Sequence, residues 1–130
     1  MKIFGIGTDI VNINRINKIL KSKGSAFKKK IFSDKEIIYC DTKKTPASYY
    51  AKRFAAKEAF AKALGTGINK DVSLKNIEIF NDFLGKPEIK LRGNLDYVLR
   101  KKIKKNKYKI YLSLSDDSPW AQATVIISYK

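Results

Sequence analysis

A single carboxylate lies in the apolar stripe of a helix that the sequence predicts near the middle of the chain. Residues 52–68 read KRFAAKEAFAKALGTGI, and Glu58 is the only charge in its row of side chains. The rest of that row, spaced by three or four residues, is Ala47, Ala51, Phe54, Ala61 and Gly65. A carboxylate that faces a core is costly unless something positive meets it. The functional question is therefore which positive group meets Glu58.

Asp9 is the second candidate carboxylate, and it follows a predicted first strand. Residues 2–10 have the pattern of a buried strand, and side chains at strand ends are well placed to meet ligands. Asp9 could join Glu58 in a magnesium site, because magnesium is commonly held by one or two carboxylates together with water and phosphate oxygens. The alternative is that Asp9 caps a helix beginning near Val11 or Asn12.

The residues that the chain lacks narrow the chemistry further. The sequence contains no histidine and a single cysteine, Cys40. Imidazole bases, Ser-His-Asp and Cys-His machinery, HExxH sites, cysteine zinc sites and internal disulfides are therefore excluded within one chain. Any metal must be bound by oxygen, which favours magnesium or a similarly hard cation.

Three cations share the predicted helix with Glu58. Lys62 lies four residues after Glu58, which suits either a surface ion pair with Glu58 or a lysine that neutralises a phosphate beside a metal. Arg53 and Lys57 are also four residues apart, and either could contact a further phosphate. The helix ends in the Gly-Thr-Gly of residues 65–67, where glycine lets the backbone come close to a ligand.

Length and composition indicate one globular domain over residues 1–130. The chain is 44% hydrophobic, and its formal net charge is +16. That charge predicts an anionic partner, unless the lysine excess only reflects the composition of a solvated surface. No apolar run is long enough to span a membrane and the N-terminus does not resemble a signal peptide, so we expect a cytoplasmic protein.

The elements that must position these residues follow from hydrophobic spacing and from helix and turn signals. Ser33 and Glu36 form a capping box for a helix over 34–41, and Thr45-Pro46 provide an N-cap and a first-turn proline for the long helix that ends at Leu64. The other predicted elements are a first helix broken at Gly24-Ser25, a short basic helix or turn over 27–32, strands over 77–83, 88–91, 108–115 and 120–129, and a helix capped by Asn94. This order predicts an α+β fold with a largely antiparallel sheet packed on a long central helix.

Four segments carry motifs that follow one another along nearly the whole chain. They are Gly5-Ile6-Gly7-Thr8-Asp9-Ile10 with Ile13 and Arg15-Ile16; Phe54-Ala55-Ala56-Lys57-Glu58-Ala59 with Lys62-Ala63 and Gly65-Thr66-Gly67-Ile68; Gly85-Lys86-Pro87; and Ser113-Leu114-Ser115 with Ala121, Ala123 and Val125-Ile126. Any one of them could occur by chance. Together they resemble the motifs of holo-acyl-carrier-protein synthases, the small 4'-phosphopantetheinyl transferases of fatty-acid synthesis.

The resemblance implies a magnesium-dependent enzyme that moves the 4'-phosphopantetheine of coenzyme A to a serine of apo-acyl carrier protein and releases adenosine 3',5'-bisphosphate. By similarity, Asp9 and Glu58 ligate the magnesium that also binds the pyrophosphate, and Lys62 neutralises the leaving or transferred phosphate. Positioning and charge stabilisation perform most of such catalysis. The serine proton could go to a metal-associated water or to Glu58, and the sequence leaves both open.

The resemblance further implies a phosphopantetheinyl transferase-like fold and a homotrimer with active sites between neighbouring chains. The residues that it predicts to contact the coenzyme are Arg53, Lys62, Gly65, Thr66, Gly85, Pro87 and Ser113. Many relatives have a histidine where this chain has Asp116, and an anionic side chain would repel a phosphate. The candidates for the 3'-phosphate of coenzyme A are therefore Arg53, Lys43 and Lys44.

The resemblance also gives the positive charge a partner, because acyl carrier proteins are strongly acidic. We expect docking on the first helix through Arg15, Lys18 and Lys21, with Lys23 nearby, unless this face is only a solvated basic surface.

Two other functions compete with the transferase. The first is a basic RNA- or DNA-binding module with Tyr49, Tyr50, Tyr108 and Tyr111 as stacking surfaces. It explains the charge, but it leaves Glu58 without a partner, and the chain has no established nucleic-acid-binding motif. The second is a metal-free protein that only binds carrier protein, which disagrees with the intact Asp9, Glu58 and Lys62. With the transferase as the main prediction, we expect neither nucleic acid nor a membrane as a partner.

Overall fold

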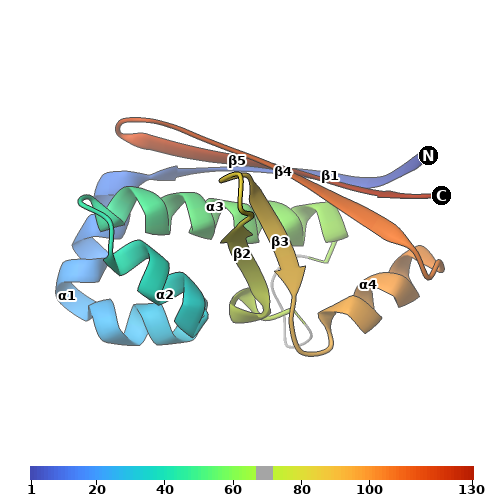
Figure 1. Ribbon diagram of the computed structural model, residues 1–130, viewed down its shortest axis with the longest axis horizontal. Helices are drawn as coiled ribbons and strands as arrows, with labels where there is room; N and C mark the ends of the chain where they lie inside the picture. Colours follow the sequence, from blue (N-terminus) through green and yellow to red (C-terminus); the bar gives the residue numbers. More distant parts are fainter. Residues whose placement is uncertain (67–71) are drawn as a thin grey trace.

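The fold is built on a three-stranded antiparallel sheet, in a computed structural model that describes residues 1–66 and 72–130. In sheet order the strands are β1 (Lys2–Asn12), β5 (Trp120–Tyr129) and β4 (Tyr108–Asp117). The long helix α3 (Pro46–Leu64) runs along one face of this sheet, as Figure 1 shows. The predicted α+β fold, with a largely antiparallel sheet on a long central helix, is confirmed.

Two glycines of β1 let α3 approach the strand at backbone distance. A Cβ atom on Gly5 would collide with the carbonyl oxygen of Ala63, and one on Gly7 would collide with that of Ala59. On the opposite face of β1, Ile6 is 65% exposed. The alternation of glycine and isoleucine therefore gives β1 one face for α3 and one outer face.

The remaining elements surround α3. They are α1 (Ile13–Ile31), α2 (Asp34–Asp41), the short 3-10 helix η1 (Leu74–Asn76), the antiparallel hairpin of β2 (Ile77–Asn81) and β3 (Pro87–Leu91), and α4 (Leu95–Ile103). In Figure 1, α1 and α2 lie at one end of the molecule, and α4 lies at the other end near the two chain termini. None of the helices in the described ranges has the length and hydrophobicity that a membrane crossing requires.

Three local signals for helix ends are confirmed. The Ser33 side chain accepts the amide N–H of Glu36, and the Glu36 carboxylate accepts the amide N–H of Ser33, which completes the capping box of α2. Pro46 begins α3, and Gly65 ends it with a φ of 89°. This left-handed conformation costs glycine little, which explains the residue type at that position.

Three expectations about helix ends are wrong. The predicted break at Gly24-Ser25 is a kink at Lys23, after which α1 continues to Ile31. Thr45 and Asn94 stand before α3 and α4, but neither side chain makes a capping hydrogen bond. In α3 the first-turn proline begins the helix without that cap.

The strand predicted over 77–83 is shorter than expected. The side chain of Asp82 accepts the amide N–H groups of Leu84 and Lys86, and this local bonding closes a turn directly after Asn81. Phe83 therefore lies in the turn with 95% of its surface exposed.

Candidate active site

An ion pair between β1 and α3 forms the centre of the site. Lys62 Nζ donates to Asp9 Oδ1 at 3.1 Å and to the backbone carbonyl of Thr8 at 2.9 Å. The side chains of Lys62 and Asp9 are 55% and 18% exposed. Lys62 thus pairs with the carboxylate of another element rather than with Glu58 on its own helix.

The helix-cap alternative for Asp9 is wrong. β1 continues to Asn12, whose side chain accepts the amide N–H of Asn14 and so caps α1. Asp9 is therefore not needed to end the strand or to begin the helix, and its carboxylate is left for Lys62 and the cleft beside it.

Glu58 lies beside this ion pair in a cleft with a volume of about 260 Å³. The cleft is lined by residues of β1, α1 and α3, namely Asp9, Ile10, Val11, Arg15, Ile16, Ile19, Phe27, Phe54 and Glu58. Partial burial raises the pKa of Glu58, the negative charge of Asp9 raises it further, and Lys62 opposes both effects. Glu58 therefore faces a cleft with both apolar and charged walls, whereas Ala51 and Ala61 of the same stripe are buried.

The two carboxylates form a donor set that fits a hard divalent cation. Asp9 raises the pKa of Glu58, so the two groups are close enough to repel each other, and a cation between them would remove that repulsion. No group of three or more histidine, cysteine, aspartate or glutamate side chains is assembled within residues 1–66 and 72–130. The protein would thus supply two oxygen ligands and leave the other positions to water and a ligand, as magnesium sites commonly do.

The fully buried charge of α3 is Lys57 rather than Glu58. Lys57 is completely buried and forms an ion pair of 2.8 Å with Glu36. The expectation that Lys57 could contact a phosphate is wrong, because its ammonium group has no exposed surface. Sequence reasoning missed the role of Glu36, which it treated only as a capping residue.

Arg53 is also withdrawn from the surface. Only 3% of its surface is exposed. Its guanidinium group donates to Asn81 Oδ1 at 2.8 Å and lies 4.1 Å from the centre of the Tyr39 ring. Lys43 Nζ lies over the same ring at 4.4 Å. Among the described residues, no hydrogen-bond partner meets Arg53 Nε. The binding of the 3'-phosphate by Arg53 or Lys43 stays a prediction.

Several other predicted contact residues lie outside the cleft. Gly65 and Thr66 follow the end of α3, whereas Gly67 and Ile68 of the same motif fall outside the described residues. The other predicted contacts that do not line the cleft are Lys62, which is paired with Asp9, and Arg53, Gly85, Pro87 and Ser113. Ser113 is exposed on β4, on the face of the sheet opposite to α3.

Asp116 has a partner of its own. Its carboxylate lies 3.4 Å from Lys52 Nζ on α3, and Lys52 in turn lies 4.5 Å from the centre of the Tyr49 ring. The strand predicted over 108–115 is longer than expected, because Asp116 and Asp117 still belong to β4.

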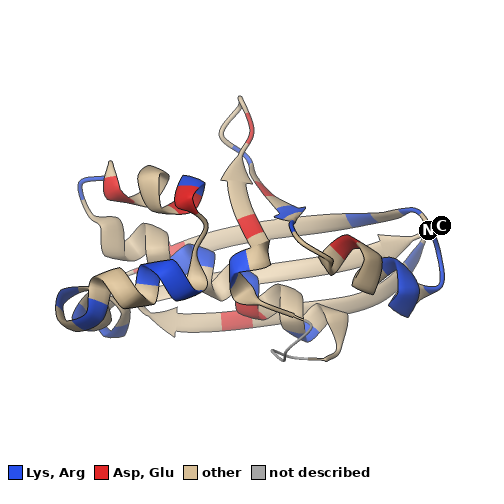
Figure 2. Cartoon of the chain, turned by 90° about the horizontal axis from the view of Figure 1, so that it is seen from below, with Lys and Arg blue, Asp and Glu red and all other residues tan. Residues whose placement is uncertain are grey.

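The basic residues predicted for docking lie exposed on α1, and one of them reaches the cleft. Arg15, Lys18 and Lys21 are exposed, and Arg15 also lines the cleft with Asp9 and Glu58. Figure 2 shows positive charge at both ends of the molecule, including the end formed by α1 and α2. The exposed basic face of α1 and the two carboxylates therefore share one border.

The comparisons with known proteins identify the family of the chain. The family model of the 4'-phosphopantetheinyl transferase superfamily matches residues 5–123. A holo-[acyl-carrier-protein] synthase of Zymomonas mobilis is 49% identical over 128 residues, which are 96% of each chain.

Solved structures agree with this family assignment. A holo-[acyl-carrier-protein] synthase from Neisseria meningitidis superposes with a TM-score of 0.88 at 42% identity, over 98% of this chain and 99% of that one. A holo-(acyl-carrier-protein) synthase from Bacillus anthracis in complex with CoA (3',5'-ADP) has a TM-score of 0.81 at 34% identity, over all of both chains. The predicted resemblance is confirmed, and this chain belongs to the 4'-phosphopantetheinyl transferase superfamily as an enzyme of the holo-acyl-carrier-protein synthase type.

Proposed function

We propose that the chain transfers the 4'-phosphopantetheine of coenzyme A to a serine of apo-acyl carrier protein in a magnesium-dependent reaction. The observation that carries this proposal is that Asp9 and Glu58 line one cleft, with Lys62 paired to Asp9 beside it. Two carboxylates and a lysine form a mixed-charge site that suits a cation and a phosphate together. The relatives that bind coenzyme A support that substrate.

Each residue of the site has a part in this reaction. Asp9 and Glu58 would hold the magnesium, which when bound neutralises oxygens of the coenzyme pyrophosphate. Lys62 has one N–H beyond those given to Asp9 and Thr8, and that donor can bind a phosphate oxygen as charge develops on it. Arg15 adds a positive charge to the lining of the cleft.

The remaining coenzyme contacts would come partly from a second copy of the chain, in a homotrimer. The outer face of the sheet carries exposed apolar side chains, which is typical of a surface that another protein covers. These are Ile6, Ile10, Tyr111 and Trp120. Ser113 lies on the same face, and the Gly85–Pro87 turn projects from another part of the chain. Both can then reach a coenzyme held by a neighbour.

The 3'-phosphate would bind at the aromatic and basic cluster of Tyr39, Lys43 and Arg53. The guanidinium and the ammonium group lie over one tyrosine ring, so the cluster concentrates positive charge at a partly dry site. Carrier protein would dock on α1, whose Arg15 links the docking face to the cleft. We place this reaction in fatty-acid biosynthesis in the cytoplasm.

The test is a transfer assay with the purified chain, coenzyme A, magnesium and apo-acyl carrier protein. Mass spectrometry should find that the carrier protein gains one phosphopantetheine group, and chelation of magnesium should prevent the gain. Asp9→Asn should lose the activity, whereas Asp96→Asn on α4, a control carboxylate bonded to Arg100 and Tyr108, should keep it. No transfer by the unmodified chain, with tight RNA binding instead, would overturn the proposal.

A further inference from the structure

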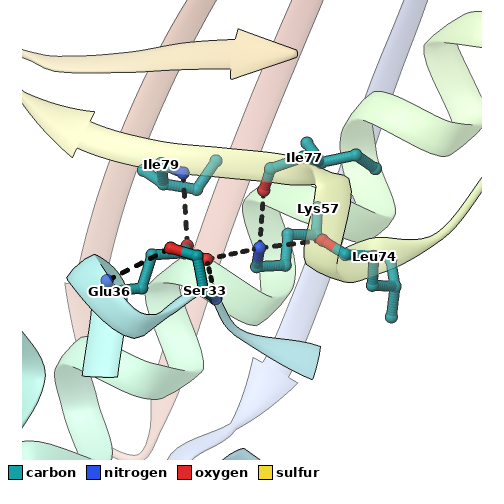
Figure 3. A network of polar contacts seen from close by, with 6 residues as sticks. All are labelled: Ser33, Glu36, Lys57, Leu74, Ile77 and Ile79. Carbon is teal, nitrogen blue, oxygen red and sulfur yellow. Dashed lines mark hydrogen bonds and ion pairs between the residues drawn. The ribbon is translucent and has the colours of Figure 1, made fainter. Parts of the chain in front are cut away.

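A network of buried polar contacts surrounds Lys57 on the side of α3 away from the cleft. Figure 3 shows Lys57 Nζ donating to Glu36 Oε1 at 2.8 Å and to the backbone carbonyls of Leu74 at 2.8 Å and Ile77 at 2.5 Å. The other oxygen of Glu36 accepts the amide N–H of Ile79 at 3.2 Å. The network therefore joins four elements: α2, α3, η1 and β2.

Every donor of the Lys57 ammonium group is used within this network. An ammonium group has three N–H donors, and the three acceptors of Lys57 are all protein oxygens. Both side chains of the ion pair are 0% exposed. Lys57 thus has neither a free donor nor a path to a ligand, although it directly precedes Glu58 in the sequence.

The position of Lys57 next to Glu58 gives the network a role in the site. Consecutive side chains of a helix point about 100° apart, so the direction of Lys57 sets the direction of Glu58. On the β1 side, α3 is held by the backbone contacts of Ala59 and Ala63 with Gly7 and Gly5. On the other side, the network holds it against α2 and β2. The helix is clamped from two sides at the residues that flank Glu58.

We propose that Lys57 and Glu36 are positioning residues that fix the rotation of α3 and thereby aim the Glu58 carboxylate at the Asp9–Lys62 pair. This inference rests on the proposed function, in which Glu58 acts. Hydrophobic residues often stabilise a protein as well as a buried ion pair does, so stability alone does not explain the pair. The contacts with Leu74, Ile77 and Ile79 are directional, and directional contacts are what orient a helix.

The test separates stability from orientation with three variants. Lys57→Met leaves the Glu36 carboxylate buried without a cation and should lower Tm by about 10–20 °C. The double variant Glu36→Gln/Lys57→Met removes both charges and should recover most of that loss. Leu99→Ala, at a fully buried position of α4, is the control that lowers stability without touching the network. Thermal unfolding gives the Tm of each variant. The kcat and the KM for coenzyme A are then measured at one temperature well below the lowest of these Tm values.

The expected result is a loss of kcat that stability does not explain. The double variant should keep kcat about tenfold or more below the unmodified chain, with KM for coenzyme A little changed, because small misplacements of a catalytic group have large effects on rate. Leu99→Ala should keep its kcat. If the double variant has full kcat, or has no lower kcat than Leu99→Ala at the same Tm, the positioning role is wrong while the proposed function stands. If the unmodified chain transfers nothing, both fail together.

Discussion

Two lysine–carboxylate pairs on α3, at Lys57 and Lys62, have similar geometry and opposite surroundings. Lys57 lies 2.8 Å from Glu36, and Lys62 lies 3.1 Å from Asp9. The first pair is 0% exposed on both sides, whereas Lys62 is 55% exposed. Each lysine reaches from α3 to a different element, Lys57 to α2 and Lys62 to β1.

The difference shows how one helix can carry both a structural and a chemical ion pair. The buried pair uses all its donors on protein oxygens, so it cannot bind a ligand and can act only through the position of α3. The pair at the cleft has a second carboxylate beside it, Glu58, whose pKa is raised by burial and by Asp9. The cleft therefore combines two carboxylates with the accessible donors of Lys62 and Arg15, a mixture of charges that suits a cation and a phosphate together.

The largest expected effect comes from the same chemical change at each pair. Glu58→Gln should lower transfer activity by about 10²–10³-fold, because a preorganised charge is lost, while Tm stays near that of the unmodified chain. Glu36→Gln should lower the free energy of unfolding by about 3–5 kcal/mol, because it leaves the Lys57 charge buried without its partner. Denaturant unfolding and the transfer assay measure both quantities. Full activity of Glu58→Gln would contradict its assignment as a metal ligand.

A smaller effect on activity is expected at Lys62. Lys62→Met should lower kcat by about 10²-fold, since a donor to the developing charge is removed. The free energy of unfolding should change by no more than about 1 kcal/mol, because the Lys62 side chain is more than half exposed. Lys62→Arg is the matched control that keeps the charge. Equal losses of stability at Lys62→Met and Lys57→Met would remove the distinction between the two pairs.

Arg15 should affect the carrier protein more than the coenzyme. Arg15→Ala should raise KM for apo-acyl carrier protein by about tenfold and weaken its dependence on salt, because a positive charge on the docking face is lost. Lys104→Ala, on the far side near α4, is the control. Steady-state kinetics at several salt concentrations measure the effect. A comparable loss of coenzyme A affinity would contradict the docking role.

The smallest expected effect is a shift in the titration of Glu58. Because its pKa is raised in the folded chain, Glu58 contributes stability that is present at low pH and lost as pH rises through the folded pKa. As the pH is lowered, Glu58 should therefore become protonated, and the activity should fall, at a higher pH than expected for an ordinary carboxylate. NMR titration without metal should show that Asp9→Asn lowers this pKa and Lys62→Met raises it. Shifts in the other directions would place Glu58 away from the ion pair.

The parts of the fold that could be predicted best from the sequence are those with local signals. The capping box of Ser33 and Glu36, Pro46 at the start of α3 and Gly65 at its end are short-range patterns, and the structure has each of them. A turn was expected at Gly85-Lys86-Pro87, but it begins earlier, at Asp82, whose side chain is of a type that forms such turns.

The site could be predicted only in part from the sequence, because its contacts join residues that are far apart in the chain. Asp9, Glu58 and Lys62 could be singled out by residue type and motif, but the pairing of Lys62 with Asp9 depends on how β1 packs on α3. Lys57, four residues after Arg53, was expected to be able to contact a phosphate. Its partner Glu36 lies 21 residues away in the sequence, and helical periodicity contains no information about such a contact.

The glycines of β1 also limit how the site can respond to its ligands. Gly5 and Gly7 bring the backbone of β1 against the backbone of α3, with no side chain between them that could change rotamer. Asp9 and Glu58 stand on these two elements and have no hinge between them. We therefore expect the spacing of the two carboxylates to stay fixed through a catalytic cycle, so that ions and phosphates must adapt to the protein rather than the reverse.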